Sequence, residues 1–209
     1  MKLTSTSLQH DAAIPSCYAF GRPDPETHIA LSDNCSPHMC WSGAPVETRS
    51  FALLCIDPDV PTVGDDVNQE GRTVPVDLPR GPFVHWVLVD MAPSCFELDE
   101  GACGSGVVAR GKQEPKGPTG SRQGVNDYTG WFSGDPDMSG TYRGYDGPCP
   151  PWNDERLHHY TFTVYALSVD RLQLEGDFTA VDARAAMDGH VLAEASLTGT
   201  YTTNPSVQG

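Results

Sequence analysis

Long apolar runs are missing from this sequence. The longest, FALLCI at 51–56, has six residues, whereas a helix needs about 20 to cross a membrane. The N-terminal stretch MKLTSTSLQHDAAIP contains one lysine and no apolar segment of the kind found in secretory signals. We therefore expect a cytoplasmic protein without a transmembrane segment.

Positive charge is also scarce. The chain has 13 lysine and arginine residues against 28 aspartate and glutamate residues, which gives a formal net charge of −15. Nucleic acids and anionic membranes are both recognised through basic side chains. The balance excludes nucleic acid as a partner and argues against broad docking on anionic lipid surfaces. An anion that binds here must be held by a local site, against the field of the whole protein.

Motifs for metal binding and catalysis are absent or incomplete. Cys35 and Cys40 flank a histidine in NCSPHMC, but no second pair follows at the spacing that a zinc site needs. Residues 66–71 match the D-x-N-x-E-G spacing of a calcium-binding loop, but Arg72 and Pro75 interrupt the pattern that follows. The sequence has no G-x-S-x-G or H-E-x-x-H motif and no serine placed beside a histidine for activation. We expect no metal, no cofactor and no catalytic residue, and hence a protein that is not an enzyme.

Cysteine occurs in an odd number. The seven residues stand at positions 17, 35, 40, 55, 95, 103 and 149. An odd count in a chain without a leader is typical of thiols in a reducing compartment and not of a disulfide framework. We therefore predict that most of these cysteines are free thiols.

Glycine and proline are abundant, at 21 and 18 residues, which favours turns and short strands over long helices. Apolar patterns predict strands at 51–56, 84–91, 160–168 and 197–202, and helix mainly within 180–195. Thr179 is expected to cap that helix, and Gly189 is expected to break it into two short helices. The pattern predicts a mainly β single domain, residues 1–209, with a core from about 15 to 203.

Polar side chains stand at or near the ends of three expected strands. Asp57 and Asp59 follow the first, His85 lies inside the second and His158 opens the third. Each one alone is compatible with an ordinary turn or a core histidine, but polar groups that meet at neighbouring strand ends are how a site is built on a sheet. Alternation places His158 on the same face as Tyr160 and turns the residue between them away.

These groups suit an anion. His85, His158 and Tyr160 offer three hydrogen-bond donors to a phosphate or carboxylate oxygen. Asp57 can accept from a histidine N–H, which fixes the tautomer and favours the cation. The remaining carboxylate is free to face an ammonium group. The set therefore predicts a site for a phosphoryl group and, more narrowly, for a zwitterion such as phosphoethanolamine.

A proline-rich stretch, YDGPCPPWNDERLHHYTF at 145–162, leads into the third strand. Pro148, Pro150 and Pro151 fix φ and remove backbone donors, so this stretch cannot join a sheet ladder. We expect it to form a rigid wall of the pocket, with Trp152 either at an apolar rim or as a plug at the end of the sheet.

Five stretches carry a resemblance to a known family. They are NCSPHMCWSGAPVETRSFALLCIDPDVP (34–61), VHWVLVDMAP (84–93), GVNDYTGWF (124–132), YDGPCPPWNDERLHHYTFTVYAL (145–167) and GHVLAEASLTGTY (189–201). In this order they resemble the phosphatidylethanolamine-binding protein family, specifically its bacterial Raf-kinase-inhibitor-like branch. The pairing of D-P-D-x-P with G-P-x-P-P and H-x-Y is specific.

The resemblance implies a β-sandwich of antiparallel and mixed strands with short peripheral and C-terminal helices. It also implies a non-catalytic pocket for phosphate-like anions and phospholipid head groups. Residue by residue, it assigns ligand binding to Asp57, Asp59, Pro61, His85, Pro150, Pro151, His158 and Tyr160. His159 stands where the family often has arginine and is left outside the pocket. A cis bond is expected at Gly81–Pro82, because family members often carry a cis peptide shortly before the strand histidine.

Two further functions stay open beside anion binding. One is inhibition or modulation of a partner kinase or protease through the pocket rim, although the sequence names no partner. The other is a hydrolase that uses the histidine and aspartate cluster. Bacterial relatives suggest a homodimer. The long polar loops 62–81 and 111–144 are expected to flank the pocket mouth, which leaves open whether a whole lipid or only a head group fits.

Overall fold

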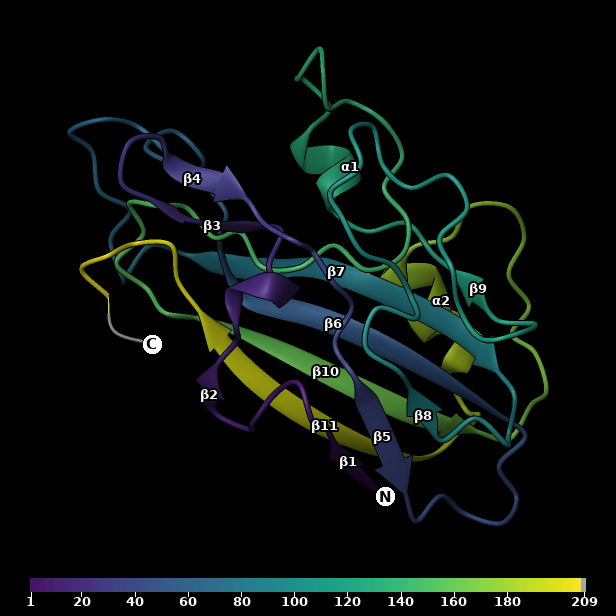
Figure 1. Cartoon of the computed structure of the whole chain (residues 1–209). Coiled ribbons are helices and arrows are strands. Elements are labelled where there is room, and N and C mark those ends of the chain that lie inside the picture. The colour runs from purple at the N-terminus through teal and green to yellow at the C-terminus, as the bar shows by residue number, and fades with distance from the viewer. Residues whose placement is uncertain (208–209) are drawn as a thin grey trace.

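A six-stranded sheet forms the centre of the molecule (Figure 1). The computed structural model describes residues 1–207. In spatial order the strands are β2 (Ala12–Ala13), β11 (Val191–Tyr201), β10 (His158–Leu167), β6 (Ser50–Pro61), β7 (Arg80–Met91) and β9 (Arg122–Gln123). Neighbouring strands are antiparallel, except that β2 runs parallel to β11. All four predicted strands are therefore confirmed, and each is part of a longer strand or close to its predicted length.

Smaller elements cover this sheet on both faces. One face carries the three-stranded sheet of β1 (Lys2–Thr4), β5 (Met39–Ser42) and β8 (Glu97–Leu98), which Figure 1 shows in front of the long strands. The other face carries helix α2 (Ala180–Met187). A hairpin of β3 (Gly21–Asp24) and β4 (His28–Leu31), the single-turn helix α1 (Tyr128–Trp131) and the 3-10 turn η1 (Ser16–Tyr18) complete the fold. The mainly β sandwich is thus confirmed.

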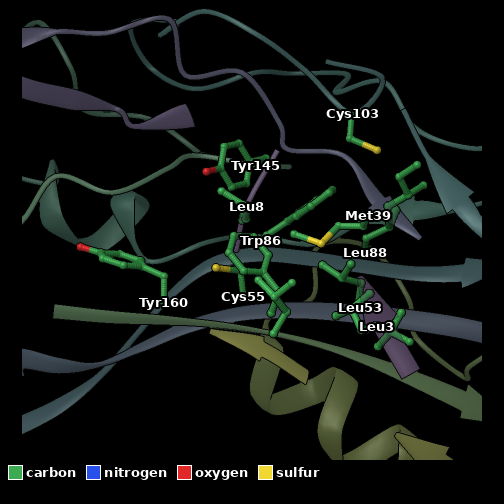
Figure 2. Packing of buried hydrophobic residues seen from close by; sticks show 14 of the residues in the cluster. Leu3, Leu8, Met39, Leu53, Cys55, Trp86, Leu88, Cys103, Tyr145 and Tyr160 are labelled. Carbon is green, nitrogen blue, oxygen red and sulfur yellow. The ribbon is translucent and has the colours of Figure 1, made fainter. Parts of the chain in front are cut away.

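The core explains why 51–56 is apolar at every position. Phe51, Leu53 and Cys55 face the larger cluster, where they pack with Trp86 and Phe162; Figure 2 shows part of it, including Trp86, Leu53 and Cys55. The residues between them, Ala52 and Leu54, face the second cluster under α2. A strand buried on both faces reads as a continuous apolar run and not as an alternating one.

Strand β7 departs from simple alternation. Trp86 lies opposite Cys55 but Val84 lies opposite Ile56, so His85 is an extra residue in β7. Such a bulge turns two successive side chains to one face. His85 consequently points to the same face as Trp86, toward the tyrosine of β10. Simple alternation along 83–91 predicts instead that His85 shares a face with Val87 and Val89, and that prediction is wrong, because those two residues belong to the cluster on the other face. The bulge aims the histidine at the end of the sheet.

The expected helix at the C-terminal end is half wrong. Thr179 and Asp182 form the predicted capping box, but α2 ends at Met187. Gly189 takes a positive φ of 72°. The chain then enters β11 at Val191, where a second helix was expected. Ten residue pairings with β10 stabilise β11 and override the helix propensity of its first residues, VLAEA. Within residues 1–207 no helix is long and apolar enough to span a membrane.

The expected cis bond is also wrong. All peptide bonds of the described residues are trans, including Gly81–Pro82. Both residues belong to β7, which starts at Arg80 and pairs Gly81 with Val60 of β6. This extended pairing begins earlier than the predicted strand at 84–91 and leaves no tight turn for a cis proline to make.

Candidate functional site

A cavity of about 220 Å³ lies at one end of the main sheet. The end of β6, the start of β7 and the start of β10 meet there, because β6 is antiparallel to both neighbours. Seven of the eight residues assigned by sequence line it: Asp57, Pro61, His85, Pro150, Pro151, His158 and Tyr160. The polar groups among them come from three separate strands, as the sequence predicted.

Asp59 is the exception. It is buried but does not line the cavity. One carboxylate oxygen accepts from Arg156 Nε at 2.6 Å and the other from His159 Nδ1 at 2.8 Å. Burial opposes ionisation, but these bonds hold the pKa of Asp59 below its usual value. Asp59 and His159 therefore form a structural cluster behind the site, and the placement of His159 outside the pocket agrees with its exposed position.

The walls of the cavity are mostly apolar and were not assigned from the sequence. The hairpin and its approach contribute Phe20, Ile29 and Leu31, the α1 region contributes Tyr128, Trp131 and Phe132, and Val60, Phe83, Cys149 and Asn68 complete the lining. Phe20, Tyr128 and Phe132 form a compact aromatic cluster, with ring centroids 4.5, 5.7 and 5.9 Å apart. Loops 62–81 and 111–144 both reach the cavity, through Asn68 and the α1 aromatics. The sequence signal that could have identified Tyr128, Trp131 and Phe132 is their grouping as aromatic residues inside an otherwise polar loop.

His158 is clamped between two carboxylates. Its Nδ1 lies 2.6 Å from Asp57 Oδ2, and its Nε2 lies 3.2 Å from Asp154 Oδ2. Burial by itself lowers the pKa of His158, but the bonds to Asp154 and Asp57 outweigh it and raise the pKa to about 9. The ring is an imidazolium at neutral pH, and both of its N–H groups donate to protein oxygens. His158 thus has no free donor for a ligand, contrary to expectation.

Asp154 was missed by the sequence analysis. It is 1% exposed and receives two hydrogen bonds from Arg80, at 2.5 and 3.0 Å. Burial opposes ionisation, but the bonds from His158 and Arg80 hold its pKa below the usual value. Asp57 accepts from His158 and also from the backbone N–H of Asp59 at 2.7 Å. Each oxygen of Asp57 therefore accepts one hydrogen bond within the protein, so the bonds to His158 and to the Asp59 backbone fix its orientation at the cavity. Asp59 lies away from the cavity and does not face a ligand there.

His85 presents a free nitrogen to the cavity. Its Nδ1 lies 2.8 Å from the backbone oxygen of Asp146, and a carbonyl only accepts, so Nδ1 carries the proton. Burial lowers the pKa of His85, so the ring is neutral at pH 7 and Nε2 holds a lone pair. Among residues 1–207 the one fully buried side-chain nitrogen or oxygen without a hydrogen-bond partner is Trp41 Nε1. Within the same range His85 is bonded only through Nδ1, and Tyr160 Oη makes no hydrogen bond. Because neither His85 Nε2 nor Tyr160 Oη is among the fully buried atoms without a partner, both keep accessible surface in the cavity that the two residues line.

Asp146 anchors this histidine and was also not foreseen. Its carboxylate accepts from Lys112 Nζ at 2.6 Å and from the amides of Asn34 and Asn126 at 2.8 Å each. Lys112 also donates to a backbone oxygen at 2.9 Å, and its side chain is only 9% exposed. A buried, fully paired carboxylate of this kind fixes its own backbone, and thereby the tautomer of His85.

The proline-rich stretch forms one wall, as predicted. Pro148 accepts at its carbonyl from the N–H groups of Phe20 and Gly21, at 2.9 and 3.1 Å, and Pro150 accepts from Thr203 Oγ1 at 2.7 Å. A side chain at Gly147 would meet the backbone oxygen of Tyr18 at 2.0 Å, so only glycine fits this close approach. The stretch is fixed through its carbonyls, and before β10 begins at His158 its one strand-like contact is a single bridge between Asp154 and Val74.

Trp152 lies at neither of the two expected places. It stacks on His28, with ring centroids 3.9 Å apart and planes 10° apart, and His28 Nε2 lies 2.7 Å from Glu70. Both rings line a second cavity of about 370 Å³ next to the first. The stack joins the β3–β4 hairpin, loop 62–81 and the proline-rich stretch, and so braces the mouth of the main cavity from outside.

The charge on His158 has a measurable consequence for stability. A histidine whose pKa is raised on folding stabilises the native state most below its unfolded value of about 6.5, and this stabilisation is lost as pH rises through the folded pKa. With a folded pKa of about 9, the free energy of unfolding should fall by about 1.5 kcal/mol between pH 6.5 and pH 8.

Urea denaturation at the two pH values measures this change. His85 does not contribute to this change, because its pKa is lowered and it titrates below the range from pH 6.5 to pH 8. His158→Gln should lose the slope, and His159→Gln, altered at an exposed ring, should keep it. An equal slope in wild type and His158→Gln would show that another group causes the pH dependence.

The fold is a mainly β sandwich, and a small cavity lies at one end of its main sheet. This combination is that of a β protein with a binding cavity. The chain belongs to the phosphatidylethanolamine-binding protein family, whose model matches residues 4–202. This confirms the family suggested by the sequence motifs.

Individual relatives agree with this assignment. The chain is 34% identical over 177 residues to the UPF0098 protein of Methanothermobacter thermautotrophicus, covering 85% of this chain and 89% of that protein. It is 29% identical to the UPF0098 protein YbhB of Escherichia coli, covering 96% and 99%. The crystal structure of Escherichia coli YbcL, described as a new member of the mammalian family, matches with a TM-score of 0.68 and 25% identity over 96% and 97% of the two chains. A relative in Mycobacterium tuberculosis, 32% identical over 88% of this chain and 68% of that protein, is named a putative lipoprotein.

Proposed function

We propose that this protein is a non-catalytic binding protein whose cavity takes a phosphate-type group, either free or as the head group of a phospholipid. One observation carries the proposal: His85 and Tyr160 line the cavity, and neither His85 Nε2 nor Tyr160 Oη is used by a hydrogen bond within the described residues. Buried polar groups are nearly always satisfied, so these two are suited to a ligand. Each hydrogen bond to a charged ligand contributes about 1.5–3 kcal/mol.

The chemistry of the free nitrogen specifies how an anion binds. Neutral His85 has only a lone pair at Nε2, so the ligand must bring a proton to this contact. A phosphate monoester is partly protonated near neutral pH, and its P–O–H donates to Nε2 while Tyr160 donates its O–H to a second oxygen. If the proton moves to Nε2, the contact becomes a charge-assisted bond. Either way the complex holds one more proton than the free protein and the dianion.

The apolar walls favour an ester over bare phosphate. Phe83, Tyr128 and Phe132 line the cavity, and the rim residues Leu31 and Trp131 are 61% and 49% exposed. An ethanolamine or glycerol substituent on the phosphate lies against these side chains, and an ammonium group gains from the aromatic faces. Phosphoethanolamine is therefore expected to bind more tightly than inorganic phosphate, and equal affinities would limit recognition to the phosphoryl group.

Catalysis is not part of the proposal. Cys149 lines the cavity, but burial raises the pKa of its thiol to about 12, so it stays protonated and weakly nucleophilic. His158 has no free nitrogen with which to activate a nucleophile, because both ring nitrogens contact carboxylates. A phosphatase and esterase screen at neutral pH should show no turnover that depends on His85.

Phosphate affinity should depend on pH. Because binding takes up one proton at the His85 contact, affinity for the dianion should fall on the order of tenfold per pH unit above about pH 7.5. Calorimetric titration in two buffers of different ionisation enthalpy should report the uptake of about one proton per phosphate bound. His85→Gln should flatten the pH profile, since an amide does not titrate, and His159→Gln should not. Affinity that is independent of pH in the wild type would contradict this mode of binding.

A further inference from the structure

Two strips of chain run side by side just before and just after the β3–β4 hairpin. The backbone N–H of Cys35 donates to the backbone oxygen of Cys17 at 3.0 Å, and the N–H of Asn34 donates to the oxygen of Ala19 at 3.1 Å. Among the cysteines of this chain, all of which the structure describes, Cys17 and Cys35 are the one pair joined by a backbone hydrogen bond. All seven cysteines are free thiols in the structure.

The backbone spacing of the pair is compatible with a disulfide. Cys17 lies in the 3-10 turn η1, and its carbonyl accepts the N–H of Cys35. The bond lengths of one N–H···O=C contact keep the two Cα atoms within about 5–6.5 Å, which lies within the range of about 4.4–6.8 Å that a disulfide spans. Both side chains pack against the same buried cluster. The Tyr145 hydroxyl lies near both thiols: burial first, and then these neighbours among others, raise its pKa. Burial first, and then Glu100 and Cys17, raise the pKa of Cys35, so the two thiols also lie near each other.

The other cysteines lack one or another of these features. Cys55 and Cys103 are 1% and 0% exposed, and Cys95 has the buried Cys103 as its cysteine neighbour. Cys149 Sγ is packed over the backbone of Gly21, and Cys40 has Thr4 and Glu97 as its strand neighbours. Cys17 and Cys35 are both partly exposed, so a small reagent reaches them without unfolding of the core.

We propose that Cys17 and Cys35 are a site of reversible covalent modification, at which a low-molecular-weight disulfide converts the two thiols into an intramolecular disulfide. The thiolate of one cysteine attacks the small disulfide, forms a mixed disulfide and releases one small thiol. The second thiolate attacks the mixed disulfide at the protein sulfur, closes the Cys17–Cys35 bond and releases the second small thiol. Two protein thiols are oxidised, and one small disulfide is reduced to two thiols.

The cross-link would close the base of the hairpin that borders the cavity. Ile29 and Leu31 of this hairpin line the cavity, and so does Phe20 beside it. Asn34, next to Cys35, donates to Asp146 at 2.8 Å and accepts from the N–H of Gly147 at 2.8 Å. The bond would therefore brace the cavity wall and the anchor of His85. This link to ligand binding rests on the proposed function, whereas formation of the disulfide does not.

Burial and the neighbouring charges raise the pKa of Cys35, so exchange should be faster at alkaline pH, where more thiolate is present. The test is to incubate the reduced full-length chain with oxidised glutathione at pH 8.5, and then to alkylate, digest and analyse it by mass spectrometry without reductant. We expect a peptide pair joined through Cys17 and Cys35, with two of the seven thiols lost to titration. Dithiothreitol should restore both.

The oxidised form should also be more stable. A bond that closes a loop of about 18 residues should raise the thermal unfolding midpoint by roughly 5–10 °C. Cys17→Ser and Cys35→Ser should each abolish the cross-link and the shift, while Cys40→Ser should retain both. A stable glutathione adduct at either residue, a disulfide between other cysteines, or no loss of thiols would overturn the proposal. A cross-link in a protein that fails to bind phosphate would leave the proposal intact and count against the proposed function alone.

Discussion

His158→Leu should lower the free energy of unfolding at pH 7 by about 3–5 kcal/mol. The substitution removes the imidazolium between Asp57 and Asp154 and leaves two carboxylates, each 1% exposed, without their shared counter-charge. Breaking a buried ion pair on one side costs more than the pair contributes, because the remaining charge stays desolvated. Asp154 keeps Arg80, so most of the loss is expected from Asp57.

If the loss of stability comes from the unpaired carboxylate of Asp57, removing that charge should reduce the loss. Asp57→Asn introduced into His158→Leu should recover part of the lost stability, although Asp57→Asn in the wild type should destabilise. His159→Leu is the matched control: its ring is half exposed, and it should change stability by less than about 1 kcal/mol. Urea denaturation of the four proteins measures these values. If His158→Leu were as stable as the control, the clamp would be of no energetic importance.

His85→Ala should weaken phosphate binding by roughly ten- to a hundredfold and leave the fold intact. His85 is the one histidine of the site with a free nitrogen in the cavity, and its other nitrogen is fixed by the backbone of Asp146. Tyr160→Phe removes the second ligand contact and should cost about two- to tenfold. Because Tyr160 Oη makes no bond within the protein, this variant tests binding without a structural loss.

Calorimetry with inorganic phosphate and with phosphoethanolamine should rank the variants in this order. His159→Ala, on the same strand as Tyr160 but facing away, serves as the control and should bind as the wild type does. Circular dichroism and thermal unfolding verify that each protein is folded. If both His85→Ala and Tyr160→Phe bound like the control, the phosphate site would lie elsewhere.

Much of the site was accessible from sequence because it follows from strand periodicity. Alternation in HHYTFTVYAL correctly separated His158 and Tyr160 from His159, and the burial of both faces explained FALLCI. The position of His85 followed from the motif, but its direction did not. A one-residue bulge in β7 turns it, and no glycine stands at the bulge itself, in FVHW, to mark its position in the sequence.

The electrostatic partners could not be predicted in the same way. Asp154 and Lys112 are charged residues in polar loops, and in sequence they look like ordinary surface residues. They become buried only because distant segments close over them: Arg80 reaches Asp154 across 74 positions, and Lys112 reaches Asp146 across 34. The same long-range pairing converted the expected second half of the C-terminal helix into β11. The role of His158 changed for this reason from a ligand donor to a buried cation.

The most direct test of the account is the protonation state of His85 with and without phosphate. Histidine labelled with ¹⁵N reports each ring nitrogen separately, and His85→Gln assigns the signals. At pH 7 the free protein should show His85 protonated at Nδ1 alone and His158 protonated at both nitrogens. Saturating phosphate should move His85 Nε2 toward the hydrogen-bonded, protonated state and leave His158 unchanged. A His85 signal that does not respond to saturating phosphate, while other histidines do, would contradict the account.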